Sequence, residues 1–464
     1  MNTERSDFDL AALRSALARR VAIPTESQDD ASRPALVRYL TDEIAPALTR
    51  LGFACTLWNN PVHGAPPFLF GARIEDSSLP TVLMYGHGDV VRGYDGQWQA
   101  AKSPWTLEVR GDRWYGRGTA DNKGQHSINL AALEHVLARR GRLGCNVKWL
   151  FEMGEEIGSP GLRAVCEAHR DALAADVFLA SDGPRLRSDM PTLFLGARGC
   201  INFTLDCHLR EGAHHSGNWG GLLANPGTIL ANAIASIVDR RGRILVEALR
   251  SPPIPASVRK ALAAIAPGEP GGPAIDLDWG EPGRTPAERV FGGNALEVLA
   301  FTTGNPRQPV NAIPSRASAT LQLRFVPPCE PEAFIPALRA HLDAQGFGNV
   351  TIARDRAEVM RATRLDPDAA WVRLAVASIE RTTGRLPAIL PNLGGSLPND
   401  CFAEVLGLPT LWIPHSYPAC AQHAPDEHLL ASVAEEGVRI MIGLFEDLPR
   451  GASTRGEAAG IRRA

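Results

Sequence analysis

The sequence lacks the features that mark membrane proteins, nucleic-acid-binding proteins and secreted disulfide-rich proteins. Its 464 residues carry a formal net charge of −3, so no excess positive charge is available to attract nucleic acid or an anionic membrane. No apolar run is long enough to span a bilayer, and none near the start resembles a signal peptide. The eight cysteines form no CxxC pair, a pattern typical of reduced core thiols. We therefore expect a cytoplasmic protein without nucleic-acid or membrane partners.

Internal repeats, a P-loop and a nucleophile elbow are also missing. Their absence argues against a solenoid, a phosphate-cradling site of that type and an α/β-hydrolase triad. A nucleophilic hydrolase using Cys200, Cys207 or Ser216 remains possible on residue type alone. Sensitivity to a chelator would separate it from a metal-dependent enzyme.

The chain is long enough for two cores, and its pattern changes twice. With 44% hydrophobic residues in 464, two domains are expected. Short apolar runs alternate with helical patterns, which favours a largely parallel α/β sheet. These runs lie at 54–58, 67–70, 81–85, 147–151, 177–180 and 410–413, with helices over 8–20, 34–51, 127–140, 160–168, 369–383 and 427–445.

Between the segments up to residue 180 and those from residue 369, polar and apolar residues alternate as in half-exposed antiparallel strands, at 200–208 and 317–326. Helices are predicted there over 226–240 and 331–345. The sequence thus predicts an α/β fold with a mixed, largely parallel sheet flanked by helices, built from residues 1–196 and 363–464. An α+β domain over 197–362 is inserted into it. Within that domain, residues 251–293 are rich in Pro and Gly and predict a partly irregular insertion. The tail from 450 is expected to be disordered.

Five short segments concentrate side chains that bind metals, and most follow a predicted strand. In His87-Gly88-Asp89 an imidazole can face a metal while the carboxylate two residues later fixes its tautomer. Asp121 lies in a glycine-rich turn before a helix. Taken alone, the first segment also fits a loop histidine beside an acid, and the second an ordinary connecting turn.

The other three segments contain Glu155-Glu156 and Asp182, each after a strand, and His423 before the last helix. Adjacent glutamates point different ways, so one can bind metal while the other faces the substrate as a base. The alternatives are a surface acidic pair and polar loop residues. Together, however, the segments supply mixed oxygen and nitrogen ligands that suit a pair of zinc or similar ions, with a free carboxylate for metal-assisted hydrolysis.

These segments, in this order, resemble the M20 family of metallopeptidases and deacylases. The stretch from Trp98 to Gly124, with SPW and then RWYGRGTADNKG, is similar to a specific signature of that family. The stretch GEEIGSPGL from Gly154 to Leu162 is a second one. The resemblance implies a two-metal amidohydrolase whose α/β domain is catalytic and whose inserted domain serves as lid and dimerisation domain. It also implies a cis peptide bond after Asp121.

Carried over residue by residue, the resemblance implies that Asp121 bridges two divalent metal ions, zinc or else Mn or Co. His87 and Asp182 would complete one metal site, and Glu156 and His423 the other. Asp89 would orient His87. Glu155 would be the general base that takes a proton from a metal-bridging water and delivers it to the leaving amine.

The resemblance extends to the inserted domain and the loop after it. His215, in His214-His215-Ser216-Gly217, would stabilise the oxyanion in the active site of a partner subunit, which implies a homodimer. Arg324 would grip a substrate carboxylate, a role that suits the arginine fork. The remaining implied substrate contacts are Asn311, Gly394, Gly395 and Ser396. The alternative for His215 is a surface histidine, and the alternative for Arg324 is an exposed strand arginine.

Three positions depart from the family pattern. The first motif lacks a proline after Asp89, Asn392-Leu393 precedes the Gly-Gly-Ser loop where Arg-Glu is usual, and Asp426 replaces Asn. None removes a proposed ligand or the base, although the second puts a simple dipeptide specificity in doubt. We expect hydrolysis of a dipeptide, an N-acyl amino acid or an N-acyl amine that bears a carboxylate. The alternative is a metal-binding homologue that acts as a binding protein, against which the intact Glu155 argues.

Overall fold

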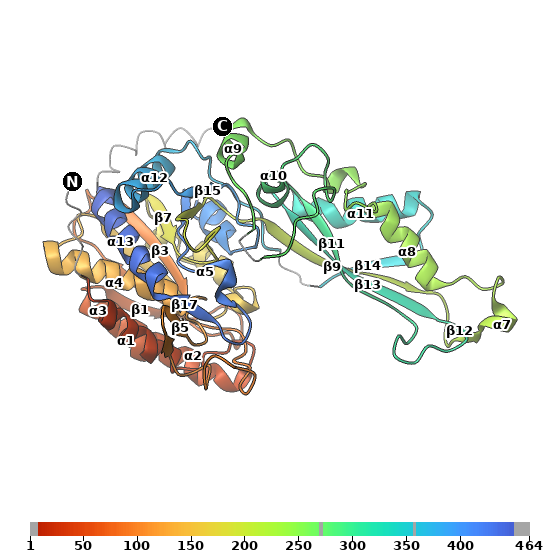
Figure 1. Cartoon of the computed structure of the whole chain (residues 1–464), viewed down its shortest axis with the longest axis horizontal. Coiled ribbons are helices and arrows are strands. Elements are labelled where there is room, and N and C mark those ends of the chain that lie inside the picture. Colours follow the sequence, from red (N-terminus) through yellow and green to blue (C-terminus); the bar gives the residue numbers. More distant parts are fainter. Residues whose placement is uncertain (1–7, 269–271, 356–358, 450–464) are drawn as a thin grey trace.

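The computed structural model describes residues 8–268, 272–355 and 359–449. Figure 1 shows two lobes, and the chain enters the second lobe and returns to the first. The large lobe holds an eight-stranded sheet, and the elongated lobe holds a four-stranded sheet. This agrees with the predicted α/β fold that carries an inserted α+β part.

The eight-stranded sheet is mixed. Its order is β1-β2-β6-β3-β7-β16-β8-β15. The pairs β3–β6, β3–β7, β7–β16 and β8–β15 are parallel, and the other three are antiparallel. The strands are β1 (Ala54–Trp58), β2 (Phe68–Arg73), β3 (Thr81–His87), β6 (Asn146–Glu152), β7 (Val177–Ala180), β8 (Thr192–Phe194), β15 (Ala388–Leu390) and β16 (Thr410–Trp412). A small sheet of β17 (His428–Leu430), β5 (Arg113–Tyr115) and β4 (Glu108–Arg110) lies beside it.

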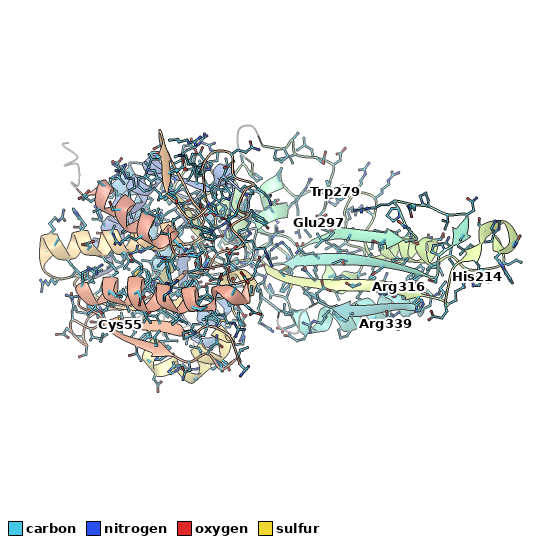
Figure 2. All side chains as sticks on the ribbon, turned by 90° about the horizontal axis from the view of Figure 1, so that it is seen from below. Cys55, His214, Trp279, Glu297, Arg316 and Arg339 are labelled. Atoms are coloured by element: carbon cyan, nitrogen blue, oxygen red, sulfur yellow. The ribbon has the colours of Figure 1, made fainter. Side chains whose placement is uncertain are left out.

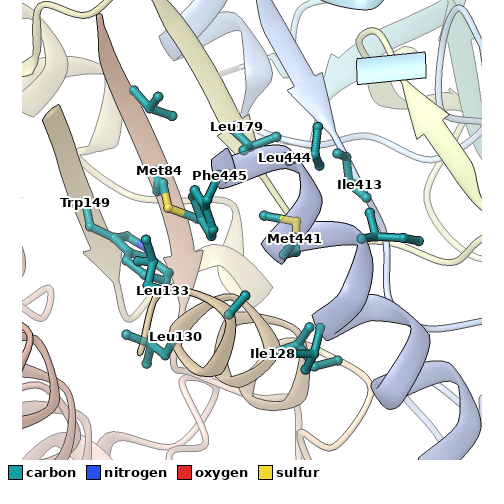
Figure 3. Packing of buried hydrophobic residues seen from close by; sticks show 14 of the residues in the cluster. Met84, Ile128, Leu130, Leu133, Trp149, Leu179, Ile413, Met441, Leu444 and Phe445 are labelled. Atoms are coloured by element: carbon teal, nitrogen blue, oxygen red, sulfur yellow. The ribbon is translucent and has the colours of Figure 1, made fainter. Parts of the chain in front are cut away.

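Alternate residues of the central strands enter two hydrophobic cores, one on each face of this sheet. From β3, Val82 and Met84 join the first core, while Leu83 and Tyr85 join the second. The first core is closed by α1 (Leu10–Val21), α4 (Lys123–Arg140), α12 (Ala370–Thr383) and α13 (Ala431–Asp447). Figure 3 shows Met84 of β3 beside Phe445 of α13, with Met441 further along the same helix. Burying each such side chain stabilises the fold by about 1.5–3 kcal/mol.

The second core is covered by shorter elements, which are α5 (Leu162–Ala168), α6 (Arg170–Leu173), α9 (Ala256–Leu262), α10 (Pro286–Phe291) and the π-helical turn Cys401–Val405. Two of them, α9 and α10, belong to the predicted irregular insertion over 251–293. The rest of that insertion forms no regular element among the residues that the structure describes. The insertion therefore packs against the large lobe through its two short helices.

The sheet of the elongated lobe is antiparallel, in the order β11-β13-β9-β14. Buried and partly exposed residues alternate along β9 and β13, as the sequence predicts for strands covered on one face. The lobe contains β9 (Gly199–His208), β11 (Ala295–Thr303), β13 (Arg316–Phe325), β14 (Val350–Arg354), α8 (Pro226–Ile237) and α11 (Phe334–Ala344). At its far end β10 (His214–His215) pairs with β12 (Ala312–Ile313) beside α7 (Ser216–Trp219).

Several helix bounds differ from the prediction. The pattern predicts a last helix over 427–445, but α13 begins at Ala431 because His428–Leu430 pair with Arg113–Tyr115 as β17. The helix predicted over 34–51, in which Pro46 predicts a kink, is divided into α2 (Arg33–Arg38), a π-helical turn (Tyr39–Ile44) and α3 (Ala45–Arg50). The π turn ends just before Pro46, whose nitrogen has no hydrogen to donate.

The remaining elements are single 3-10 turns at Asp30–Ser32, Glu155–Ile157, Glu247–Leu249, Pro331–Ala333 and Pro418–Cys420. Within the described ranges, no helix has both the length and the apolar character needed to cross a membrane. The tail predicted to be disordered, from 450, lies outside the described residues.

Candidate metal and substrate site

Parallel strands bring the first group of ligand-type side chains together. His87 is the last residue of β3, and Asp182 follows the neighbouring parallel strand β7. The His87 Nε2 atom lies 3.1 Å from Asp121 Oδ1 and 3.4 Å from Asp182 Oδ2. All three side chains are buried. The edge of the sheet where the two strands end thus gathers one imidazole and two carboxylates.

Asp121 also belongs to a second group. The Nε2 atom of His423 lies 3.0 Å from Asp121 Oδ2 and 3.1 Å from Glu156 Oε2. The two oxygens of Asp121 therefore face different histidines. In each group the ligand atoms lie within 4.8 Å of one another. Two sets of three ligands that share one carboxylate can hold two cations side by side.

The chemistry of these donors fits divalent metal ions. His87 Nε2, Asp121 Oδ1 and Glu156 Oε1 are buried atoms that make no contact with hydrogen-bond geometry among the described residues, although the first two lie 3.1 Å apart as an ion pair. Buried polar atoms of proteins normally have a partner, so three such atoms at one place indicate room for a ligand. Imidazole nitrogen with carboxylate oxygen is a donor set that zinc and similar ions accept.

Charge pairing in these groups shifts the pKa values of both histidines. Hydrogen bonds to Asp121 and Glu156 raise the pKa of His423 to about 11. Burial alone would lower the pKa of His87, but bonding to Asp121, Asp182 and Asp89 raises it well above its usual range. The carboxylates that favour the charged form of these imidazoles are the groups that would balance the charge of metal cations.

The backbone around Asp121 is fixed by a buried carboxylate. Glu427 Oε1 accepts the N–H groups of Ala120, at 2.9 Å, and Asp121, at 3.0 Å. Its Oε2 accepts Arg117 Nη1 at 2.7 Å. The peptide bond from Asp121 to Asn122 is cis, as the family resemblance implied. Directly after it, α4 begins.

Asp89 contacts both ligand-bearing loops. Its Oδ1 lies 3.3 Å from His87 Nδ1, on the opposite side of the ring from Asp121. Its two oxygens accept the N–H groups of Glu155, at 3.2 Å, and Glu156, at 3.1 Å. His87 Nδ1 also lies 3.1 Å from the backbone carbonyl oxygen of Asp89. A carboxylate behind a metal-binding imidazole can fix its tautomer, and this orienting role of Asp89 stays a prediction.

Glu155 lies in neither ligand group. It begins a 3-10 turn after β6 and lines the same cavity as Asp121 and Asp182. Burial raises the pKa of Glu155 well above its usual range, although the charge of His87 opposes the effect. A carboxylate with a raised pKa, next to ligands but not among them, has the properties of a general acid and base.

A cavity of about 960 Å³ connects the ligand groups to the elongated lobe. Arg324, Gly394, Gly395 and Ser396 also line it, and Arg324 Nη1 donates to Ser396 Oγ at 3.0 Å. Ile275 and Trp279 of the insertion contribute an apolar wall. The predicted substrate residues of the Gly-Gly-Ser loop and β13 therefore share one cavity with the predicted base.

His215 and Asn311 lie elsewhere. His215 pairs with Ala312, and the Asn311 carbonyl accepts the N–H of Ser216 at 2.8 Å. Figure 2 shows the neighbouring His214 at the far end of the elongated lobe. A single chain therefore does not bring these two residues to the metal ligands.

Sequence reasoning missed three residues around the site. Glu427 fixes the Asp121 loop, Gln422 Nε2 donates to Asp121 Oδ2, and Arg198 lines the cavity. Glu427 and Gln422 lie in the segment that contains His423, and this closeness in sequence was the only feature that could have pointed to them. Asp426, where Asn is usual in the family, accepts the N–H groups of Gln99 and Ala100 through one oxygen. An amide oxygen can accept in the same way, so the exchange retains the contact.

Comparison with known proteins agrees with this geometry. The sequence model of peptidase family M20/M25/M40 matches residues 83–447. A cysteinylglycine-S-conjugate dipeptidase of Corynebacterium striatum is 26% identical over 363 residues, which are 76% of this chain and 77% of that protein. A Beta-Ala-His dipeptidase of Rattus norvegicus is 29% identical over 297 residues, 60% of this chain and 58% of that relative. The chain thus aligns with less than two thirds of the rat protein.

Solved structures share the whole fold. Human carnosine dipeptidase 1 has a TM-score of 0.74 at 22% identity, covering 95% of this chain and 96% of that one. The M20 family metallo-carboxypeptidase Sso-CP2 of Sulfolobus solfataricus has a TM-score of 0.77 at 23% identity, covering 94% and 99%. Since the family match spans most of the chain and contains every ligand of both groups, this protein belongs to peptidase family M20/M25/M40 and is a metal-dependent hydrolase.

Proposed function

We propose that the protein hydrolyses a small amide, either a dipeptide or an N-acyl amino acid or amine, with two divalent cations bound per chain. The observation that carries this proposal is the shared carboxylate, because Asp121 is a member of both ligand groups. His87 and Asp182 would complete one site, and Glu156 and His423 the other. Zinc is the first candidate, and the same ligands accept Mn or Co.

When bound, such cations polarise the scissile carbonyl and lower the pKa of water towards neutrality. The protein's own residues then carry the proton. Glu155 would accept it from the attacking water and return it to the nitrogen of the leaving amine. Asp89 supports this step, because its oxygens hold the backbone of Glu155 and the ring of His87 together. We also expect a bound cation to favour the ionised form of Glu155, opposing the effect of burial.

Arg324 and its neighbours in the cavity suit a substrate carboxylate. Arg324 is held towards the cavity by Ser396, and backbone groups of Gly394 and Gly395 lie next to it. A guanidinium fork binds a carboxylate with two parallel hydrogen bonds. Both the dipeptidase names of the relatives and this arginine favour a leaving amine that carries a free carboxylate, such as the C-terminal residue of a dipeptide.

We further propose a homodimer formed through the elongated lobe, with His215 and Asn311 serving the cavity of the partner. Its edge strand β11 exposes Val298, Leu299 and Phe301. Exposed apolar edge strands are normally covered in native proteins. Near His215, the tip exposes Trp219 and Val310 as well. On this proposal the domain boundaries are residues 1–196 with 363–464 for catalysis and 197–362 for the lid and dimer contact.

A cytoplasmic location is part of the same proposal. Cys145, Cys166 and Cys207 are buried free thiols, which persist where the surroundings are reducing. A location in an oxidising compartment would not change the assignments at the site.

The test combines metal analysis with hydrolysis. Purified protein would be assayed for bound metal, then for release of free amine from dipeptides and N-acyl amino acids, with and without a chelator. About two metals per chain and chelator-sensitive hydrolysis support the proposal. Two metals without hydrolysis of any panel member would favour the non-catalytic binding protein. Hydrolysis unaffected by complete metal removal would favour a nucleophilic enzyme.

A further inference from the structure

A second arginine faces the substrate cavity. Arg198 directly precedes β9, is only 9% exposed, and lines the cavity together with Arg324. Its Nε donates to the carbonyl of Gly394 at 2.8 Å. Its own carbonyl accepts the hydroxyl of Ser396 at 2.8 Å, and that hydroxyl accepts Arg324 Nη1. The two guanidinium groups are therefore held on one wall by a continuous hydrogen-bonded chain.

The charges of these arginines are not balanced by the protein. In the described part of the chain, no carboxylate lies within salt-bridge distance of either guanidinium group. Burial, and then the charge of Arg324, lowers the pKa of Arg198 to about 10. Glu297, labelled in Figure 2, also lines the cavity and its charge acts on Arg198, but its carboxylate forms no ion pair with either arginine in the described part of the chain. Two like charges in a partly buried place are costly unless an anion joins them.

The cavity supplies a place for that anion. Glu155 and the shared ligand Asp121 line the same cavity, so a substrate amide at the ligand groups would share this cavity with the two arginines. Arginine forks match carboxylates in shape as well as in charge. The Nε bond to Gly394 leaves the terminal nitrogens of Arg198 for such a ligand, because no other partner of these nitrogens exists among residues 8–268, 272–355 and 359–449.

We propose that Arg198 and Arg324 jointly bind the carboxylate on the leaving amine, and that Arg198 thereby sets the preference for substrates in which that carboxylate is free. The inference rests on the proposed amide hydrolysis and adds a specificity-determining residue to it. It predicts that the enzyme distinguishes a free carboxylate from its neutral amide mainly through binding.

The experiment compares two substrates that differ only in this group. Each has the acyl half that wild type prefers, followed by glycine or by glycinamide. For Arg198→Met we expect kcat/KM on the glycine substrate to fall about 10- to 100-fold, the loss of a charge-assisted hydrogen bond. The fall should come mainly from KM, while kcat/KM on the glycinamide substrate changes less than about threefold. The matched control is Arg316→Met, because Arg316 is an exposed arginine of β13 paired with Asp206 outside the cavity.

Each outcome decides a separate point. Equal loss on both substrates would assign Arg198 a structural role and overturn the inference. If Arg198→Met does not fold, Arg198→Lys carries the test, since it keeps the charge but loses the fork, and a loss confined to the glycine substrate is again expected. Wild type that cleaves neither substrate, with two metals bound, would contradict the proposed function itself and the inference with it.

Discussion

The carboxylate of Glu427 accepts the backbone N–H of Asp121 at 3.0 Å, although the two residues are 306 positions apart in the chain. Asp121 belongs to both ligand groups, and Glu427 follows His423 of the second group by four residues. The contact therefore ties the loop of the shared ligand to the segment that carries the last histidine. Glu427 also forms a buried ion pair with Arg117, and both side chains are 1% exposed.

We expect Glu427→Gln to damage both folding and metal binding. It would leave the buried Arg117 without its counter-charge, which costs about 3–5 kcal/mol in the free energy of unfolding. Loosening the Asp121 loop should weaken metal affinity about 10- to 100-fold. Denaturant unfolding and metal titration measure the two effects. Glu435→Gln, which breaks an exposed pair with Arg439, should change stability by less than about 1 kcal/mol. Unchanged metal affinity in Glu427→Gln would refute the coupling.

Glu155→Gln should separate metal binding from turnover. The amide retains the size of the side chain but cannot accept the proton, so kcat should fall at least about 10²-fold. Metal content should equal that of wild type, because Glu155 belongs to neither ligand group. Metal analysis and steady-state kinetics on one preparation give both numbers. Loss of metal together with activity would instead make Glu155 a ligand.

His215→Ala tests the role across subunits. The variant should lose most activity while keeping its metals, because His215 lies at the far tip of the elongated lobe. Mixing it with Glu155→Gln under conditions that exchange subunits should restore activity, since one cavity in each mixed dimer then has both an intact base and an intact His215. Each variant remixed with itself is the control. No recovery in verified mixed dimers would exclude the proposed role.

Stability should fall in mild acid because of His415. This side chain is fully buried, and burial lowers its pKa well below 6.5. The folded protein keeps the ring neutral while the unfolded chain takes up a proton. The contribution of His415 to the free energy of unfolding is thus complete above about pH 6.5. Below that pH it declines by up to about 1.4 kcal/mol per pH unit.

Denaturant unfolding between pH 5 and 7 would measure how the free energy of unfolding depends on pH. The difference between wild type and a His415 variant gives the contribution of His415. His415→Gln should flatten the dependence on pH, whereas His63→Gln, at an exposed position, should retain it. A His415→Gln slope equal to that of wild type would show that other groups account for the acid sensitivity.

Features encoded in local pattern were predictable from the sequence. The apolar run from Thr81 predicts β3, and parallel pairing with β7 then brings His87 and Asp182 to one edge of the sheet. Local pattern also singled out Asp121, Glu156 and His423 as candidates, the family resemblance assigned the five residues to two sites, and the structure brings all five together. Their roles as metal ligands remain predictions until metal is measured.

Features that depend on distant contacts were not predictable. The helix predicted from Ser127 begins at Lys123 as α4, because buried polar residues in its first turn hide the apolar period. Strand β11 was missed because most of its side chains are exposed, so burial imposes no alternation on them. Arg198 gave no local signal, since its partner Gly394 is 196 positions away.

The long strand β13 also fixes how far one chain can reach. Arg324 lies near its cavity end, and Arg316 begins it eight residues earlier, a separation of about 26 Å at the usual rise of a strand. The pairing of Ala312 with His215 lies beyond that point. A fully extended dipeptide spans only about 7 Å. β13 is thus a spacer of set length that keeps His215 away from any substrate held by Arg324 of the same chain.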